Sequence, residues 1–399
     1  MPDPAPREGI APTVKGLALV SLLNDFASEM VYPLLPAFVV GTLGGSATML
    51  GALDGAADLA ASGTKWLAGS LADRPGRRKP LILGGYWLAA LIRPVIAMAG
   101  AAWQVVGLRV VDRVGKGFRS PPRDALIAEV TPPALRGRAF GYHRMADHLG
   151  SVPGALLAWW LLSLGWETRQ VLMVSVLPGI AAAVVLVLVL RRAPAHAVSD
   201  APARLTEPAV PGVVAHPPGF WPPVLALALL VLLRLPETLL LLRLQDAGLA
   251  AALVPLVWAG LHVVRTGVSY PGGWLADHLG PRGAVAAGGV AFALGAAGLA
   301  AVGTPVLAVA VFLALGVVAG LMEPAERLLV ARLAPKRTGR GYGAYHSVTG
   351  LAALPAGVAF GALYTGAGGS AALLASAGGM LLATGVWLAA TRRLENGEG

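Results

Sequence analysis

The stretch GSLADRPGRR, Gly69 to Arg78, decides the fold, because a second copy of it, GWLADHLGPR, runs from Gly273 to Arg282. The two aspartates, Asp73 and Asp277, stand 204 residues apart (277 − 73). A second pair of related stretches, Pro122 to Gly141 and Pro324 to Gly343, has a similar offset of 202 residues (324 − 122). The chain therefore contains a duplicated unit.

The composition indicates a membrane protein. Of 399 residues, 56% are hydrophobic and 13% are charged. A soluble protein carries about a quarter charged residues, so lipid must cover much of this surface. The net charge of +10 comes from short basic clusters between apolar stretches, and no basic face favours nucleic acid. The absence of cysteine excludes disulfides, thiolate metal sites and cysteine nucleophiles.

Apolar stretches of about 20 residues predict the membrane spans. The first six are expected near 16–41, 47–70, 80–101, 103–120, 139–164 and 170–190. The second six are expected near 221–244, 248–271, 283–303, 305–330, 341–365 and 370–390. Six prolines interrupt the region between them. We therefore expect an N-terminal half over 1–190, a cytoplasmic linker over 191–220 and a C-terminal half over 221–399.

The loops between these spans alternate in charge. Every second loop is basic, as around Arg77, Arg136, Arg191, Arg282 and Arg337. The intervening loops, as around Gly44 and Gly303, are short and nearly uncharged. Basic loops stay in the cytoplasm, so this alternation predicts a multi-pass protein of the cytoplasmic (inner) membrane with both termini cytoplasmic.

The first repeated stretch resembles the signature loop of the major facilitator superfamily, G-x-x-x-D-[RK]-x-G-[RK]-[RK], at every specified position. The second copy departs from it at His278 and Pro281. The stretch from Arg113 to Gly117 resembles that family's R-x-x-Q-G element, with Lys116 in place of Gln. The resemblance implies an all-α membrane protein with twelve transmembrane helices in two pseudo-symmetric six-helix halves, working by alternating access.

The resemblance also implies a cytoplasmic gate in the signature loops. The aspartate at the end of the second span opposes the negative end of its own helix dipole and so needs a partner. The alternative is that these charges only set the topology. The expected gate residues are Gly69, Asp73, Arg74, Gly76, Arg77, Arg78, Asp277 and Arg282.

Charged residues inside spans are costly unless they are paired or face water. Asp25 and Glu29 lie four residues apart, on one face of the first span near mid-membrane. We expect Asp25, nearer the centre, to carry a transported proton and Glu29 to be paired with an arginine. Arg113 and Arg93 are the expected counter-charges, and Arg113 matches a family position linked with coupling. The alternative is a set of permanent ion pairs.

Other polar residues inside spans predict a substrate cavity between the halves. These are Asn24, Asp58, Arg93, Arg234, Glu237, His262 and Arg265. Arg234 and Glu237, three residues apart, are also placed to neutralise each other. Gly141, Gly150 and Gly154 resemble an element of the family's antiporters that lacks its usual proline here, and helix packing explains these glycines equally well.

These patterns favour a monomeric proton-coupled secondary transporter without a cofactor or bound metal, exporting a small organic compound. One alternative is transport of a metal ion or metal chelate through Asp25, Glu29 and Asp58, whose oxygens suit hard metals. A second alternative is a membrane-embedded enzyme that holds Mg²⁺ and a prenyl diphosphate at Asp54 and Asp58. No other aspartate pair completes such a site, so no enzyme activity is expected. A non-transporting scaffold or sensor is a third.

Overall fold

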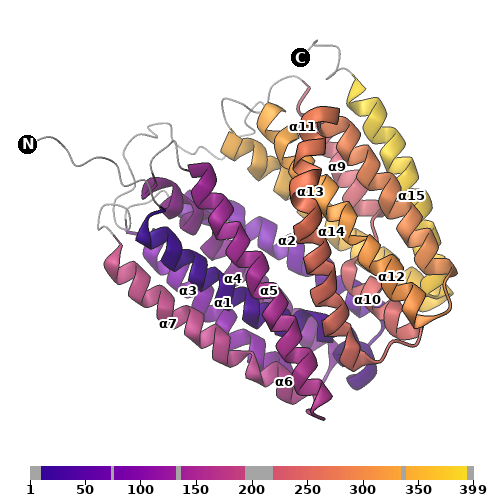
Figure 1. The fold of residues 1–399 in the computed structure, drawn as a ribbon, viewed down its shortest axis with the longest axis horizontal. Helices are drawn as coiled ribbons and strands as arrows, with labels where there is room; N and C mark the ends of the chain where they lie inside the picture. The colour runs from indigo at the N-terminus through magenta and orange to yellow at the C-terminus, as the bar shows by residue number, and fades with distance from the viewer. Residues whose placement is uncertain (1–9, 73–75, 132–135, 194–218, 334–337, 393–399) are drawn as a thin grey trace, which may run out of the picture.

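The computed structural model describes residues 10–72, 76–131, 136–193, 219–333 and 338–392. Within these ranges the chain forms helices joined by short turns, with no strand (Figure 1).

The first group of helices comes from the N-terminal part of the chain. Its bounds are α1 Pro12–Val31, α2 Ala47–Ala72, α3 Arg78–Val95, α4 Ala102–Glu129, α5 Arg136–Ser163, α6 Thr168–Val174 and α7 Val176–Arg192. Short turns of tighter or wider helix follow α1, at Tyr32–Leu34 (η1) and Ala37–Thr42 (η2), and follow α3 at Ile96–Met98 (η3). Within the group α1 packs between α5 and α7, and α3 packs against α4 and α7.

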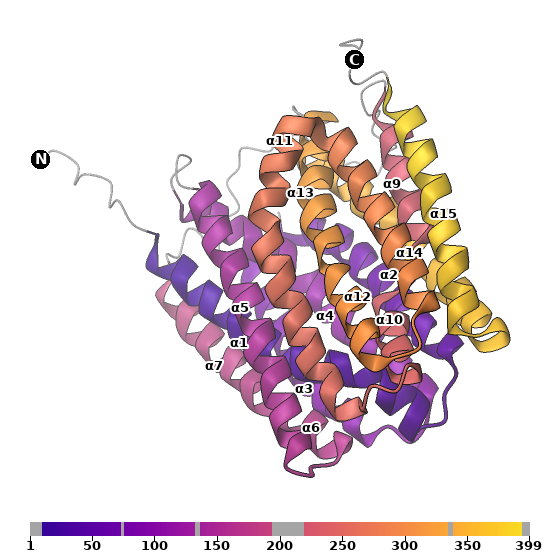
Figure 2. The ribbon, with the colours of Figure 1, turned by 45° about the vertical axis from the view of Figure 1, so that its right-hand side comes forward.

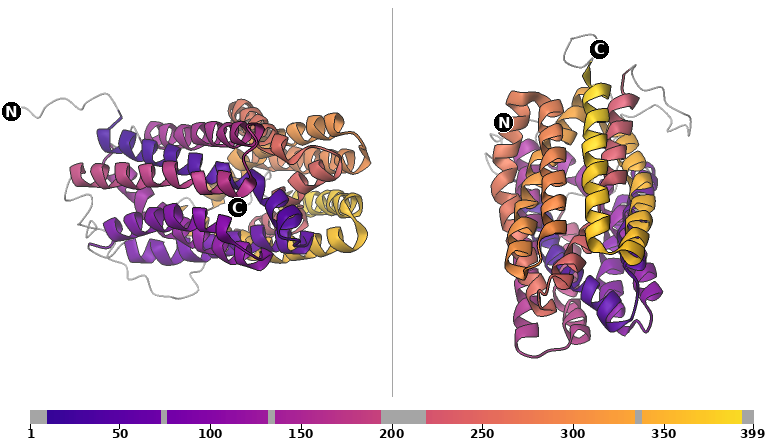
Figure 3. Two further views of the ribbon diagram at one scale, coloured as in Figure 1. Left: turned by 90° about the horizontal axis from the view of Figure 1, so that it is seen from below. Right: turned by 90° about the vertical axis from the view of Figure 1, so that its right-hand side faces the viewer.

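The second group comes from the C-terminal part. Its bounds are α9 Trp221–Leu233, α10 Glu237–Asp246, η5 Ala251–Leu253, α11 Val254–Ala301, α12 Pro305–Ala314, α13 Gly316–Leu333, α14 Thr338–Ala367 and α15 Gly369–Ala390. α11 packs against α13 and α15, and α9 packs against α14 and α15. Figure 3 shows α1–α7 on one side of the molecule and α9–α15 on the other. That these groups act as separate halves stays a prediction.

Eight segments of the described chain are long and apolar enough to cross a membrane, which makes this a multi-pass membrane protein. Six of them lie in the second group. The other four expected spans overlap α1, α2, α4 and α5, which carry intramembrane charges such as Glu29, Asp58, Asp112 and Asp147; the first, 16–41, runs past the end of α1 at Val31 through η1 and η2. The count of twelve stays a prediction.

The helix bounds correct several expected spans. α4 continues past the expected end at residue 120 to Glu129. The expected spans 248–271 and 283–303 fall largely on α11, a single helix over Val254–Ala301 that is kinked at Gly280. The expected span 221–244 is interrupted between Leu233 and Glu237. Proline explains this last break, because it disfavours helix in the residue before it, and Pro236 stands there.

The two copies of the signature stretch turn at the same position. Gly76 has φ +71° and its counterpart Gly280 has φ +73°. Residues with a side chain rarely adopt this left-handed conformation. Glycine therefore recurs at this position of the repeat because the backbone there is left-handed.

The two groups meet closely along α2 and α14. A methyl group built on Gly51 would lie 2.1 Å from the carbonyl oxygen of Gly357, and one on Gly361 would lie 2.6 Å from that of Ala47. Near the loop that precedes α2, Thr48 Oγ1 and Thr365 Oγ1 lie 3.1 Å apart. On the opposite side of the molecule α5 packs against α11. Away from these contacts the groups diverge, toward the end where α1 begins and α15 ends (Figures 1 and 2).

Exposed tryptophans lie near both ends of the helices. Trp103, Trp160 and Trp166 stand near the loops that follow η3 and α5. Trp66, near the end of α2, and Trp221, at the start of α9, stand toward the other end. Indole rings favour the interface between lipid and water, so these positions suit two interfacial belts.

Candidate functional site

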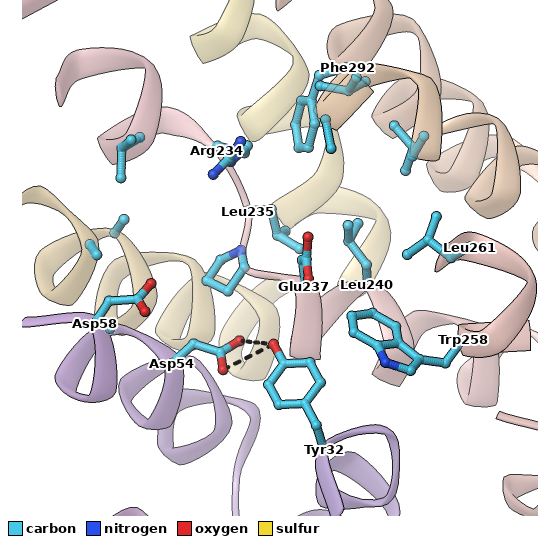
Figure 4. Close-up of a pocket in the computed structure, with 18 of the residues that line it drawn as sticks. Tyr32, Asp54, Asp58, Arg234, Leu235, Glu237, Leu240, Trp258, Leu261 and Phe292 are labelled. Atoms are coloured by element: carbon cyan, nitrogen blue, oxygen red, sulfur yellow. Dashed lines mark hydrogen bonds between the residues drawn. The ribbon is translucent and has the colours of Figure 1, made fainter. Parts of the chain in front are cut away.

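A cavity of about 380 Å³ lies between the two groups of helices (Figure 4). Its first wall comes from α1, η1, α2 and α4 and includes Glu29, Tyr32, Asp54, Asp58 and Arg113. Its second wall comes from α9 to α11, together with α12, α13 and α14, and includes Arg234, Glu237, Trp258, His262 and Arg265. Of the residues assigned to the cavity from the sequence, Asp58, Arg234, Glu237, His262 and Arg265 line it, and so do Glu29 and Arg113 of the coupling set.

The interruption between α9 and α10 places Arg234 on the wall. Arg234 has extended backbone angles, φ −92° and ψ 125°. Ser376 of α15 satisfies the exposed backbone here: its Oγ accepts the Leu235 N–H at 2.9 Å and donates to the Leu233 carbonyl at 2.8 Å. A broken helix is tolerated at membrane depth only where such partners exist. The break therefore places the Arg234 side chain at the cavity without leaving the backbone groups of Leu233 and Leu235 unpaired.

Asp54 joins the two groups across the cavity. Its Oδ2 accepts hydrogen bonds from the Thr238 backbone N–H at 3.2 Å and from Thr238 Oγ1 at 2.7 Å. The Tyr32 hydroxyl lies 3.2 Å from both carboxylate oxygens of Asp54. Thr238 stands in the first turn of α10, where the helix dipole favours a negative charge. Asp54 of the first group thus caps a helix of the second.

Glu29 also reaches across the interface. Its Oε2 accepts a hydrogen bond from Trp258 Nε1 at 2.8 Å and lies 3.9 Å from His262 Nε2. Trp258 packs between Tyr32 and His262, with ring centroids 5.1 Å and 5.0 Å away. Among the described residues Glu29 has no arginine partner. The expectation that Glu29 pairs with an arginine is wrong, because a neutral indole N–H occupies its carboxylate.

Glu237 pairs with Arg265, whose guanidinium also lies 5.6 Å from the centre of the Trp258 ring. The expected neutralisation of Glu237 by Arg234 is therefore replaced by a contact with the next helix. Arg234 and Asp58 are exposed, and neither has a described hydrogen bond or ion pair. Arg113 lines the first wall, and its Nε has no hydrogen-bond partner in the described structure.

A buried ionic cluster supports the first wall from behind. Asp112 accepts from Arg93 Nε at 2.9 Å and from Arg109 Nη1 at 3.1 Å. Arg93 also donates to the backbone carbonyl of Asn24 at 2.8 Å, and the Arg109 guanidinium lies 5.2 Å from the centre of the Tyr32 ring. All three charged side chains are at most 2% exposed, so the cluster is structural.

This cluster corrects two assignments made from the sequence. Arg93 and Asn24 were expected in the cavity, yet they are 2% and 4% exposed and lie behind its wall. Arg93 was also expected to neutralise Asp25 or Glu29, but Asp112 takes its charge. Asp25, half-buried, accepts a hydrogen bond from Asn24 Nδ2 at 2.9 Å and is not part of the wall.

Sequence reasoning missed several residues of this site. Arg109 and Asp112 stand three residues apart inside the fourth expected span, and that spacing alone was a sufficient signal. Asp54 was weighed only as a metal ligand. Tyr32 and Trp258 resemble many other aromatic residues of the chain, and no sequence pattern distinguishes them.

The expected gate lies partly outside the described residues, which leave out Asp73 and Arg74. Gly69 lies in α2 and Asp277 in α11, Gly76 makes the left-handed turn, and Arg77 is exposed beside the start of α3. Arg78 pairs with Glu129 at the end of α4. Its counterpart Arg282 donates to the Leu388 carbonyl of α15 at 3.1 Å. Both arginines thus hold neighbouring helices of their own group together.

The glycines of α5 serve helix packing. A methyl group on Gly150 or Gly154 would lie 2.2 Å or 2.4 Å from the carbonyl oxygens of Leu22 and Phe26 on α1. Gly141 is part of the same helix. No cluster of three or more His, Asp or Glu side chains suited to a metal occurs among the described residues.

Comparison with known protein sequences finds a matching family and several relatives. The sequence model of the Major Facilitator Superfamily matches residues 17–357. Rv2265, an uncharacterized protein of Mycobacterium tuberculosis, is 31% identical over 267 residues, or 66% of this chain and 64% of that protein. The chain thus matches just under two thirds of the length of that relative. The multidrug resistance protein MdtH of Aeromonas hydrophila is 37% identical over 151 residues, 38% of each chain.

Solved structures share the fold at low sequence identity. A bacterial homolog of the human lysosomal transporter Spinster, in an inward-facing conformation, has a TM-score of 0.74 at 17% identity, covering 97% of this chain and 99% of that one. The nucleoside transporter NupG has a TM-score of 0.75 at 15% identity, covering 96% and 100%. Together with the match over residues 17–357, these findings show that the chain belongs to the major facilitator superfamily of membrane transporters.

Proposed function

We propose that this transporter exports a small organic compound across the cytoplasmic membrane in exchange for protons, with Glu29 as the proton-binding residue. The observation that carries the proposal is the surroundings of Glu29. Its carboxylate lies in the cavity wall between the two groups, against Trp258 and His262 and without a described arginine. A carboxylate at membrane depth is costly to keep ionised unless it is paired or hydrated, and binding a proton removes that cost.

The other carboxylates of the cavity are better compensated or freely hydrated. Asp54 accepts from two groups of Thr238 and from Tyr32, and Glu237 pairs with Arg265. Three donors or a guanidinium stabilise the ionised form. Asp58 is exposed to the cavity, where water can hydrate it. We therefore choose Glu29, whose described hydrogen bond is a single one from the indole of Trp258, as the proton-binding acid.

Protonation of Glu29 has a direct mechanical consequence. Trp258 stands on α11 of the second group, so the hydrogen bond from its indole to Glu29 bridges the interface. A hydrogen bond to an ionised acceptor is roughly twice as strong as a neutral one. Proton uptake therefore weakens a contact between the groups, and proton release restores it. Protonation of Glu29 is thereby linked to the contact between the two groups, which alternating access must open and close.

The arrangement of the two groups is consistent with export across the cytoplasmic membrane, and one relative supports it. The contacts along α2 and α14 lie toward the loop that precedes α2, while the groups diverge toward the end that carries the basic loops. Under the positive-inside rule the diverging end faces the cytoplasm, where an exporter binds its substrate and an importer releases it. The similarity to MdtH, named as a multidrug resistance protein, agrees with this direction.

Proton movement in proteoliposomes tests the proposal. Purified protein is reconstituted with a pH-sensitive dye inside the vesicles, and organic compounds that raise its melting temperature are added outside. Wild-type protein should move protons when such a compound is added. Glu29→Gln, which mimics the protonated acid, should lose proton movement and retain exchange of labelled compound.

Asp25→Asn is the matched control, because Asp25 stands four residues earlier on the same helix and outside the cavity wall. It should keep proton movement within about twofold of wild type. Wild-type proton movement in Glu29→Gln would refute the role of Glu29. Its loss in Asp25→Asn would return the proton to the residue first expected from the sequence.

A further inference from the structure

We propose, on the basis of the transport function above, that the substrate is a small zwitterion. Its cationic group binds Asp58, its anionic group binds Arg234, and its apolar body lies toward Phe292 and Leu261. The two charged side chains come from opposite walls of the cavity, Asp58 from α2 and Arg234 from the end of α9.

The first support is which charges of the cavity are already in use. Most of its acids and bases have partners within the protein. The described pairs are Glu29 with Trp258 and His262, Asp54 with Thr238 and Tyr32, and Glu237 with Arg265. Asp58 and Arg234 are the exposed charged residues of the wall, and the described residues offer neither a hydrogen bond nor an ion pair. Both remain available to a ligand that brings the opposite charge.

The second support is the difference in charge between the walls. The first wall carries three carboxylates and one guanidinium, those of Glu29, Asp54, Asp58 and Arg113. The second wall carries two guanidiniums and one carboxylate, those of Arg234, Arg265 and Glu237. The first wall is thus net negative even with Glu29 protonated, and the second is net positive. A ligand with one charge of each sign gains from both walls, whereas a singly charged ligand is attracted by one and repelled by the other.

The third support is the placement of apolar surface. Figure 4 shows Asp58 and Arg234 toward one side of the cavity, with Phe292, Leu261 and Trp258 toward the other. A ligand that fills this space therefore carries its two charges near one end and an apolar or aromatic body at the other. The volume of about 380 Å³ is at the small end of the range of ligand pockets, about 300–1,000 Å³.

Equilibrium binding to matched compounds tests the substrate class. The full chain, purified in detergent, is titrated with aromatic amino acids and with dipeptides that contain phenylalanine. Each is tested as the zwitterion, as the N-acetyl derivative that keeps only the negative charge, and as the amide that keeps only the positive charge. We expect the zwitterion of at least one scaffold to bind about tenfold more tightly than both derivatives, the range of one charge-assisted contact.

Two variants assign the charges. Asp58→Asn should remove the preference for the zwitterion over the N-acetyl form, since the amine then has no acidic partner. Arg234→Gln should remove the preference over the amide. Glu167→Gln and Lys15→Gln each remove one exposed charge away from the cavity and should keep both preferences. Melting temperatures and size-exclusion profiles establish that each variant is folded.

Each outcome has a defined meaning. Equal affinity for all three forms, a preference for a singly charged form, or no binding of any form in any scaffold would overturn the proposal. These measurements involve no pH gradient, so they are independent of proton coupling. Zwitterion selectivity without proton movement would overturn the coupling alone, and proton movement without selectivity would overturn the substrate class alone.

Discussion

At the residue scale, two aspartates carry different kinds of contact. Asp112 lies within one group of helices and is held by two arginines, so its interactions are the same whichever way the groups are arranged. Asp54 is held by Tyr32 of its own group and by Thr238 of the other. Its contacts must break when the groups separate. The first aspartate therefore supports the fold, and the second stabilises one arrangement of it.

Replacing Asp54 tests this distinction. Asp54→Asn should lower the melting temperature of the purified protein, because charge-assisted bonds worth about 1.5–3 kcal/mol become neutral ones. Thr238→Val removes the hydroxyl donor and keeps the backbone N–H, so its effect should be smaller. Thr266→Val is the control, since Thr266 is exposed and its hydroxyl bonds only to the His262 carbonyl of its own helix at 2.8 Å. An unchanged melting temperature in Asp54→Asn would show that the cap contributes nothing.

The sequence shows which charged residues lie inside a span, but it does not show whether they face the cavity. The presence of Glu29, Asp58 and Arg265 at membrane depth indicated a polar interior, and they line the cavity. Arg93 gave the same signal and lies behind the wall. The sequence gives the depth of a charge in the membrane. Its direction around the helix depends on which helices pack beside it, and that is a property of the folded molecule.

At the element scale, the contact between α2 and α14 depends on glycines. A methyl group on Gly55 would lie 2.6 Å from the Ala353 carbonyl oxygen and equally close to the backbone of Leu354. Backbone atoms cannot move aside as the end of a side chain does. Interfaces between membrane helices often depend on such small residues. Here the contact joins the two groups, so the proposed alternating access requires it to open.

A bulky residue at this contact should prevent the closed arrangement. Gly55→Leu should reduce exchange of a bound compound in proteoliposomes at least tenfold while leaving the protein folded, since the groups are then held apart. Gly63→Leu is the control on the same helix, because a methyl group there would meet nothing within 4 Å. Wild-type exchange in Gly55→Leu would mean that the close approach is not needed in the cycle.

The break between α9 and α10 shows how much of an element a sequence reveals. The expected span 221–244 was placed correctly, and Pro236 inside it was a signal for an interruption. What the sequence did not reveal was the partner. Ser376 stands far along the chain, on α15, and its hydroxyl satisfies the exposed backbone of Leu233 and Leu235. Such a long-range contact has no local pattern.

At the scale of the whole molecule, the sequence predicted the family but not the contacts that join the two groups. The repeated signature stretches led to the superfamily, which the family match confirms. They also directed attention to the end of the molecule with the basic loops. The contacts that join the groups in the described structure, such as Thr48 with Thr365 and Gly51 with Gly357, lie toward the opposite end. They carry no motif because small residues and threonine are common throughout the chain.

A reversible cross-link tests whether these groups move as the family fold implies. The chain has no cysteine, so Thr48→Cys with Thr365→Cys introduces a single pair of thiols, at positions whose hydroxyls lie 3.1 Å apart. Side chains this close bring two thiols within reach of each other for oxidation to a disulfide. Oxidation should abolish transport and reduction should restore it, while each single variant stays active in both conditions. Undiminished transport by the oxidised pair would show that this contact stays closed throughout the cycle.

The exposed tryptophans at both ends of the helices give the surrounding lipid a part in this cycle. Because indole rings stay at the interface, the two belts set the acyl-chain thickness that the molecule matches best. The two groups diverge at one end in this arrangement, so they must tilt to meet at that end in another arrangement. Tilting a helix changes the hydrophobic thickness that it spans across the bilayer. Shorter or longer acyl chains would therefore favour different arrangements without any change at the cavity. We therefore expect the rate of transport to depend on the acyl-chain length of the surrounding lipid.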